Sequence, residues 1–452
     1  MVNNLTSAPL PKLIKQIAVP ASIGFFFNTM LNVVDTFYAG LVSTQAVAAL
    51  SLSFPIFFVI IALGSGISTG NNALISNFLG EGNLDKAKRF VAQGLSFSLF
   101  VGLLCSIIGY FSAEPLLRIL GAEGEYLGQA LQYLNVIVWG TTIFILLFVM
   151  NSGLQAQGDT KSFRNTFIFS FILNLFLNPW FIFGGLGMPA LGLAGIAYAT
   201  LVVETVGVMY WTYRLIKSGL LCAQCFEQFA PRAKDYWAIA QQGFPASLNM
   251  MTVAIGIFII TYFIAPFGQL AVAAYGIATR IDQIALLPTI GLNMAALTLT
   301  GQNNGAKKFD RIRECIRLTI KYGLFVVVPG MILTGIFAPY LIDVFTEDPD
   351  TVEIGTKYLR ISLFIYPAYL LLYLTTSVLQ GLKKPNYAIW IGIYRQILLP
   401  ALIFPFLIGL MSGSIFGIWW GIFIINWSAT LISLWYLRRT FRKITQNPAI
   451  LK

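Results

Sequence analysis

Long apolar segments constrain this chain more than any other feature. Segments of about 20 mainly apolar residues recur along it, and each can cross about 30 Å of hydrocarbon as a helix. Only helices and closed barrels satisfy their backbone hydrogen bonds in lipid, and the short alternating segments of a barrel are missing. The sequence therefore predicts an all-α integral membrane protein with twelve helices, at 13–37, 44–70, 90–112, 130–151, 163–184, 190–213, 238–264, 271–299, 318–340, 357–380, 386–409 and 414–437.

The chain also contains an internal duplication. Repeats within a membrane chain are typical of secondary transporters, whose substrate site lies between the halves. Each predicted half has an even number of helices, so both halves enter the membrane from the same side. We predict two pseudo-symmetric six-helix bundles around a central cavity. The motifs that return in the second half, all at one constant offset, are Pro20-Ala21-Ser22 as Pro245-Ala246-Ser247, Ala46-Val47-Ala48-Ala49 as Ala271-Val272-Ala273-Ala274, Gly80 as Gly305, Tyr133-Leu134 as Tyr358-Leu359, and Leu154-Gln155 as Leu379-Gln380.

Lys and Arg residues predict the orientation of these bundles. Most of the 29 Lys and Arg residues lie near the N-terminus, in loops after even-numbered helices, and in the tail. Because positive charge accumulates on cytoplasmic loops, we expect both termini in the cytoplasm. The net charge of +11 then reflects topology, and its spread over separate segments argues against nucleic-acid binding. The predicted domains are an N-terminal bundle (1–213), a cytoplasmic linker (214–236), a C-terminal bundle (237–437) and a cytoplasmic tail (438–452).

Five ionisable acidic or basic residues fall within the predicted helices: Asp35, Glu204, Arg280, Asp282 and Arg395. Each costs about 2.5–3.5 kcal/mol at the middle of a membrane helix unless a partner or a water-filled cavity compensates it. Arg280 and Asp282 are two apart, so they cannot face each other on one helix. Either one can pair with Arg395 or Glu204 on another helix, and we expect these four residues to form a buried ion-pair network.

Asp35 is the strongest candidate for a functional charge. Asn28 and Asn32 precede it at helical spacing and form one polar stripe, which we expect to face the interior. Pro20 lacks an N–H and crowds the carbonyl four residues back, so we expect this helix to kink or bend there. The alternative is that Asp35 only ends the helix near the outer interface, a position that would not need the two asparagines.

Further polar residues of the first half are candidates for a pocket around Asp35. Asn174 and Asn178 lie four residues apart on one helix face and offer amide donors and acceptors to a carboxyl group in the membrane. Structural hydrogen bonding between helices is the alternative for this pair. The other pocket candidates are Tyr133, Asn151, Tyr198, Thr200 and Glu204.

A single carboxyl group in a low-dielectric pocket suits antiport. Such a group prefers to be neutral or paired, so a proton and an organic cation compete for it, and antiport requires this mutual exclusion. The counterpart of Asp35 in the register of the repeat is Ile260, so we expect ion coupling in the first half only. The 37 Phe, 19 Tyr, 9 Trp and 10 Met residues include enough adaptable apolar surface to line a cavity for lipophilic cations.

A set of motifs spread over nearly the whole chain carries a family resemblance. The motifs are Pro20, Val33-Val34-Asp35-Thr36-Phe37-Tyr38-Ala39-Gly40, Gly80-Glu81-Gly82-Asn83, Asn151 with Leu154-Gln155-Ala156-Gln157-Gly158-Asp159, and Gly305 with its basic loop. Together they resemble the multidrug and toxic compound extrusion (MATE) family, in particular its DinF-like bacterial branch. The resemblance implies two six-helix bundles in the bacterial cytoplasmic (inner) membrane that expel cationic and amphipathic drugs in exchange for protons or sodium. It also implies ion coupling at Asp35, bending of the first helix at Pro20, and pocket roles for Tyr133, Asn151 and Asn174.

The chain departs from that branch in two respects. Some members carry a second acid on the fifth helix, where this chain has Asn178. The predicted seventh and tenth helices lack the buried acids that other branches use. A sodium site prefers more anionic oxygen ligands than one carboxylate and amides provide. We therefore expect proton coupling, with sodium as the alternative.

Two other classes of function, a flippase and an enzyme, fit the sequence less well than an antiporter. A flippase for lipid-linked precursors would need several cationic side chains for a pyrophosphate head group, and the predicted helices offer only Arg280 and Arg395. The chain has no His and no HExxH, GxSxG or P-loop motif, so we expect neither an enzyme nor a metal site or cofactor. We expect a monomer in the lipid bilayer.

Overall fold

Helices form almost all of the fold. The computed structural model describes residues 5–185, 187–222 and 227–446. Eleven helical spans in this part are long and apolar enough to cross a membrane, or twelve if the bent pair α4 and α5 counts as one more. This confirms the predicted all-α membrane fold. The elements are α1 (Leu10–Val42), α2 (Thr44–Gly80), α3 (Leu84–Ile119), α4 (Gly124–Trp139), α5 (Thr141–Ala156), α6 (Lys161–Phe183), α7 (Leu193–Ser218), α8 (Ala233–Ile264), η2 (Ala265–Phe267), α9 (Gln269–Gly305), α10 (Phe309–Asp343), α11 (Pro349–Ser362), η3 (Leu363–Ile365), α12 (Tyr366–Gly381), α13 (Asn386–Ile393), the π-helical η4 (Tyr394–Leu398), α14 (Leu399–Leu410) and α15 (Phe416–Gln446).

The predicted helix 130–151 is broken in the structure. Helices α4 and α5 meet at Gly140 with a bend of 45°. A Cβ atom at Gly140 would lie 2.0 Å from Leu201 Cδ2, so α7 packs directly against the break. In the second copy the 3₁₀ turn η3 separates α11 from α12, and its last residue, Ile365, matches Gly140 in the repeat register. Both copies therefore interrupt this helix at the same register position, although in the second copy Pro349–Gly381 still counts as one span.

Two tight turns also match between the copies. Gly82 and Gly158 have φ angles of +75° and +80°, in the left-handed region. Their register counterparts are Lys307 and Lys383, with φ angles of 57° and 58°. A side chain in this region costs on the order of 1–3 kcal/mol, which only the surrounding structure can compensate. Both copies therefore have the same two turns, although the second copy has lysine where the first has glycine.

The chain divides into two compact units that exchange helix segments. Unit 1 spans Ile23–Ser247, and unit 2 combines residues 5–22 with residues 248–446. The first part of α1 therefore belongs to unit 2, and the first part of α8 belongs to unit 1. The two switch points, after Ser22 and after Ser247, match in the register of the repeat, and each follows closely on a proline, Pro20 or Pro245. The domain boundaries predicted from the sequence contain no such exchange.

Equivalent contacts hold the two exchanged segments. In unit 2, Ser22 Oγ donates to the Pro288 carbonyl at 3.0 Å. In unit 1, Ser247 Oγ donates to the Leu63 carbonyl at 3.4 Å. One turn along each receiving helix, Gly291 and Gly66 allow the backbones to approach closely. A Cβ atom would lie 2.3 Å from Ser22 Oγ at Gly291 and 1.9 Å from Ser247 Oγ at Gly66.

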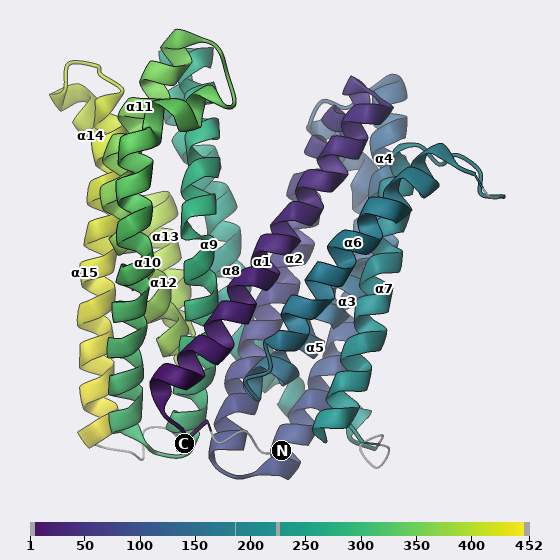
Figure 1. Cartoon of the computed structure of the whole chain (residues 1–452), viewed down its shortest axis with the longest axis vertical. Helices are drawn as coiled ribbons and strands as arrows, with labels where there is room; N and C mark the ends of the chain where they lie inside the picture. The colour runs from purple at the N-terminus through teal and green to yellow at the C-terminus, as the bar shows by residue number, and fades with distance from the viewer. Residues whose placement is uncertain (1–4, 186, 223–226, 447–452) are drawn as a thin grey trace. The chain divides into compact units, whose positions relative to one another are not determined.

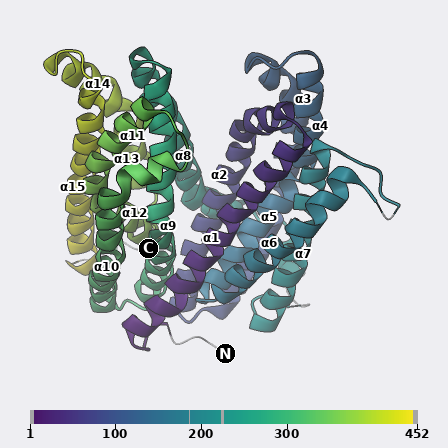
Figure 2. The same ribbon diagram turned by 45° about the horizontal axis from the view of Figure 1, so that its top comes forward.

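Within each unit the helices pack as neighbours along much of their length. In unit 1, α2 packs against α3 and α5, and α6 runs beside α7 (Figure 1 and Figure 2). In unit 2, α9 packs against α10, α11 and α12, and α14 packs against α15. Unit 1 contains α6, α7 and the part of α1 that follows Ser22, and the candidate site forms there.

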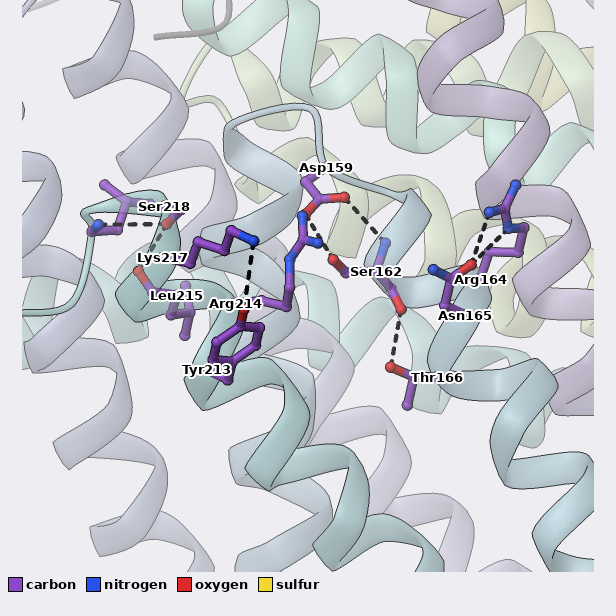
Figure 3. Close-up of polar contacts among 11 residues, drawn as sticks. Asp159, Ser162, Arg164, Asn165, Thr166, Tyr213, Arg214, Leu215, Lys217 and Ser218 are labelled. Carbon is purple, nitrogen blue, oxygen red and sulfur yellow. Dashed lines mark hydrogen bonds and ion pairs between the residues drawn. The ribbon is translucent and has the colours of Figure 1, made fainter. Parts of the chain in front are cut away.

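The turn between α5 and α6 is fastened to α7 by Asp159, the last residue of one of the motifs that carry the family resemblance. Its carboxylate accepts from the Ser162 backbone N–H at 3.1 Å, which caps the first turn of α6. It also accepts from Ser162 Oγ and from Arg214 Nη2, each at 2.7 Å (Figure 3). Asp159 therefore ties three segments of unit 1 together, which explains this part of the motif by structure.

The end of the linker lies against α3. The buried side chain of Gln93 donates to the carbonyls of Gln228 and Ala230 and accepts from the Arg232 N–H at 3.1 Å. Arg89 of α3 forms an ion pair with Asp235 in the first turn of α8. These contacts attach the end of the linker and the start of α8 to unit 1.

Candidate functional site

A cluster of polar side chains surrounds Asp35 in unit 1. Asn178 Nδ2 donates to Asp35 Oδ1 at 2.9 Å, and Thr200 Oγ1 lies 3.5 Å from Asp35 Oδ2. Asn178 also donates to Asn174 Oδ1. The structure thus brings together residues of α1, α6 and α7 that the sequence predicted as one site. We call Asp35, Asn174, Asn178 and Thr200 the Asp35 cluster.

The members of the cluster on α6 are buried, and Asp35 is partly exposed. Asn174 and Asn178 are 1% and 0% exposed, whereas Asp35 is partly exposed. The asparagines lie one helical turn apart, so both amides face α1. Tyr38 OH donates to the Leu175 carbonyl at 3.1 Å and fixes α1 against α6 next to the cluster. The amide groups of α6 are therefore more deeply buried than Asp35.

Two further buried residues interact electrostatically with Asp35. Tyr133 of α4 is 7% exposed, and Glu204 of α7 is 8% exposed. Glu204 lies one turn after Thr200, on the same face of α7. Its Oε2 atom is buried and has no hydrogen-bond partner, and the same is true of Asn178 Oδ1. The site therefore contains a second carboxyl group and more acceptor oxygens than donors.

Among the described residues, no hydrogen bond joins the predicted pocket residues Asn28, Asn32, Asn151 and Tyr198 to the Asp35 cluster. Asn32 is exposed, and its amide donates to the Asn28 carbonyl within α1 at 3.1 Å. Tyr198 is 43% exposed. Asn151 is buried, but no hydrogen bond links it to the cluster, and its Oδ1 atom is unpaired. Asn28, Asn32 and Asp35 share one face of α1. Of these three, Asp35 is the residue with hydrogen bonds to α6 and α7 among the described residues.

The predicted ion-pair network is wrong for the residues of unit 2. Arg280 is exposed, and no ion pair within the described residues joins Arg280, Asp282 and Arg395. Asp282 instead accepts hydrogen bonds from the hydroxyl groups of Tyr358, Ser362 and Tyr366, at 3.1, 3.0 and 2.7 Å. Three hydroxyl donors satisfy this carboxylate without a cation. Their spacing of four residues is a sequence signal that the charge-based reasoning missed.

Arg395 is held by aromatic rings and an amide. It lies on the π-helical turn η4, and its guanidinium centre is 5.6 Å from the ring centroid of Tyr369 and 5.4 Å from that of Tyr373. It donates to Asn426 Oδ1 and to Tyr373 OH, both at 3.2 Å. Cation–π contacts of this kind stabilise a desolvated guanidinium group. Arg395 is thus engaged by its own unit.

Comparison with known families identifies the repeated unit. The sequence profile of the family described as MatE matches residues 20–180 and again residues 245–405. The second matched segment begins and ends at the same offset from the first as the repeated motifs, which confirms the internal duplication. The matched segments cover the Asp35 cluster up to Asn178 in the first copy and Asp282 and Arg395 in the second.

Relatives and solved structures extend over nearly the whole chain. A FAD transporter of Shewanella oneidensis is 28% identical over 399 residues, covering 88% of this chain and 88% of the relative. The multidrug export protein MepA of Staphylococcus saprophyticus is 25% identical over 414 residues, covering 90% and 89%. The solved structure of a multidrug resistance MATE family transporter of the MOP superfamily, in an outward-facing conformation, is 24% identical. It covers 99% of both chains with a TM-score of 0.91.

Proposed function

Because this chain belongs to the MatE family of multidrug efflux transporters, which are not enzymes, we propose that it exports cationic or amphipathic organic compounds by antiport with a cation coupled at Asp35. The observation that carries the proposal is the Asp35 cluster. It holds a partly exposed aspartate with amide and hydroxyl partners and no ion pair within the described residues.

The mechanism follows from the need to neutralise a carboxylate in a low-dielectric site. A proton or an organic cation can neutralise Asp35, and the two exclude each other. When Asp35 takes up a proton, its hydrogen bonds to Asn178 and Thr200 must rearrange, because a neutral carboxyl group accepts less strongly. We propose that this rearrangement lets α1 bend near Pro20 and release the drug outward.

We propose protons as the coupling ion, with sodium as the second candidate. The sequence offers one carboxylate and two amides as ligands for a coupling ion, which favours protons over sodium. The structure adds Glu204, whose buried Oε2 atom is unpaired, and so supplies further anionic oxygen near Asp35. Sodium therefore remains the second candidate. An efflux assay with separate proton and sodium gradients distinguishes the two ions.

Organic cations fit the site better than anionic substrates. The flavin nucleotide of the Shewanella relative and the pyrophosphate of a lipid-linked precursor both carry phosphate groups, which call for free cationic side chains. Arg395 is buried and engaged by Tyr369, Tyr373 and Asn426, and the site around Asp35 is acidic. We therefore favour drug export over a flippase or nucleotide carrier.

Efflux from proteoliposomes tests this proposal. Purified protein is reconstituted in liposomes loaded with a fluorescent lipophilic cation, and a proton gradient or a sodium gradient is imposed in separate runs. We expect the proton gradient to drive export. Export driven by sodium alone would change the coupling ion and leave the antiport intact. If neither gradient drives export but FAD or a lipid-linked precursor is moved, the drug antiporter is contradicted.

Replacing Pro20 with alanine is expected to slow export several-fold while drug binding is retained. Alanine supplies the N–H that proline lacks and removes the ring clash, so α1 resists bending. Initial rates of export and equilibrium binding of the fluorescent cation are measured on the same preparation. Pro115→Ala on the exposed face of α3 makes the same exchange away from the site and should leave the rate unchanged. Unchanged turnover in Pro20→Ala would contradict a hinge at this residue.

The charge distribution supports a topology for the transporter. We propose that both termini lie in the cytoplasm, because Lys and Arg residues concentrate in the segments that this orientation places inside. We further propose that the protein is a monomer in the bacterial cytoplasmic membrane.

A further inference from the structure

Glu204 and Asp35 occupy the same site in unit 1. Thr200 Oγ1 lies 3.5 Å from Asp35 Oδ2, and Glu204 follows Thr200 by one turn of α7. Residues four apart share a helix face, so Glu204 faces the Asp35 cluster. Glu204 is 8% exposed, and it interacts electrostatically with Asp35. The further titratable side chain that interacts with Asp35 is Tyr133, on α4.

The hydrogen bonds of the site leave negative charge without compensation. Neither Asp35 nor Glu204 takes part in an ion pair among the described residues. Glu204 Oε2 and Asn178 Oδ1 are buried acceptors without a donor. Buried acceptors require a donor, a water molecule or an ion, and two neighbouring carboxylates repel each other strongly in a low-dielectric interior. Protons or cations that neutralise the two acids therefore stabilise the site.

Both acids belong to the first copy of the repeat alone. The register counterpart of Asp35 is Ile260, and α15, the last helix of the second copy, contains no Asp or Glu. A glutamate that served only to pack α7 would not need an acidic neighbour, and the second copy builds the same helix without it. The two acids therefore form one feature of unit 1.

We infer that Glu204 is the second acidic residue of the coupling site, so that the site exchanges two positive charges in each cycle instead of one. The inference rests on the proposed antiport. Its consequence is electrical. Exchange of one monovalent drug cation for one inward charge is electroneutral, whereas exchange for two moves net positive charge inward. A membrane potential then drives export even when the pH is equal on both sides.

Potential-driven export tests the inference. Proteoliposomes are loaded with tetraphenylphosphonium, a monovalent lipophilic cation, and a potassium gradient with valinomycin sets an inside-negative potential at equal pH. Flux in protein-free liposomes is subtracted, because the probe itself responds to the potential. We expect wild-type protein to export the probe under this potential and Glu204→Gln to lose that response while it still exports under a pH gradient. Asp35→Asn should lose both responses.

Two further variants separate a charge effect from a folding effect. Glu204→Asp keeps the carboxylate and should restore the response to potential. Thr205→Val changes the next residue of α7, whose hydroxyl bonds to the Leu201 carbonyl at 2.7 Å within the helix, and should behave as wild type.

The outcomes distinguish the inference from the proposed function. If no ion gradient drives export in the wild type, the antiport itself is contradicted. If a proton or sodium gradient drives export but the wild type ignores the potential, the antiport stands and the role of Glu204 is wrong. The same holds if Glu204→Gln keeps the response to potential.

Discussion

Replacing Asp35 with asparagine is expected to reduce gradient-driven efflux to the rate of protein-free liposomes. Asparagine keeps the size of the side chain, but it cannot take up a proton and carries no charge for an organic cation. It also offers an amide where Asn178 Nδ2 now donates to a carboxylate oxygen at 2.9 Å. The measurement is the initial rate of export of the fluorescent cation under the gradient that drives the wild type.

An exposed acid provides the matched control for this variant. Asp310 on α10 is fully exposed, and its 3.6 Å ion pair with Arg313 lies at the surface, where such pairs contribute little. Asp310→Asn should therefore export at the wild-type rate and unfold at the wild-type temperature. Efflux in Asp35→Asn at the wild-type rate would show that coupling takes place elsewhere in the chain.

Adding a methyl group at Gly66 is expected to destabilise the protein by about 1–3 kcal/mol, the usual cost of overpacking a tight contact. A Cβ atom there would lie 1.9 Å from Ser247 Oγ, 2.5 Å from Ser247 N and 2.7 Å from its Cα. Two of these atoms belong to the backbone of α8, which cannot move away without shifting the whole helix segment. We expect Gly66→Ala to lower the apparent melting temperature in detergent, followed by intrinsic fluorescence.

The repeat supplies both a replicate and a control for this experiment. Gly291→Ala places a Cβ atom 2.2 Å from the Ala18 carbonyl oxygen and should destabilise the protein in the same way. Gly276 lies on the same helix, α9, with no atom within 4 Å of an added Cβ. Gly276→Ala should be neutral or slightly stabilising, because alanine favours a helix over glycine. Equal melting temperatures for all three variants would contradict the close contact.

The outline of the fold could be predicted because its signals are local. A run of about 20 apolar residues needs only its own backbone hydrogen bonds to be a membrane helix. The internal duplication is visible as repeated residues at one register. The break at Gly140 could not be read in this way, because it depends on the close approach of Leu201 from α7.

The sequence by itself determined the helical membrane fold and the duplication, and it singled out Asp35 as a candidate site residue, because a charge inside an apolar helix stands out without knowledge of its neighbours. The pairing of buried polar groups was decided by the tertiary structure. Asp282 bonds to hydroxyl groups and not to an arginine, and Glu204 interacts electrostatically with Asp35. The exchange of the first parts of α1 and α8 between the units was likewise invisible in the sequence. The physical reason is the same in each case: the partner of a side chain depends on how two helices are rotated and packed, and no local pattern encodes that choice.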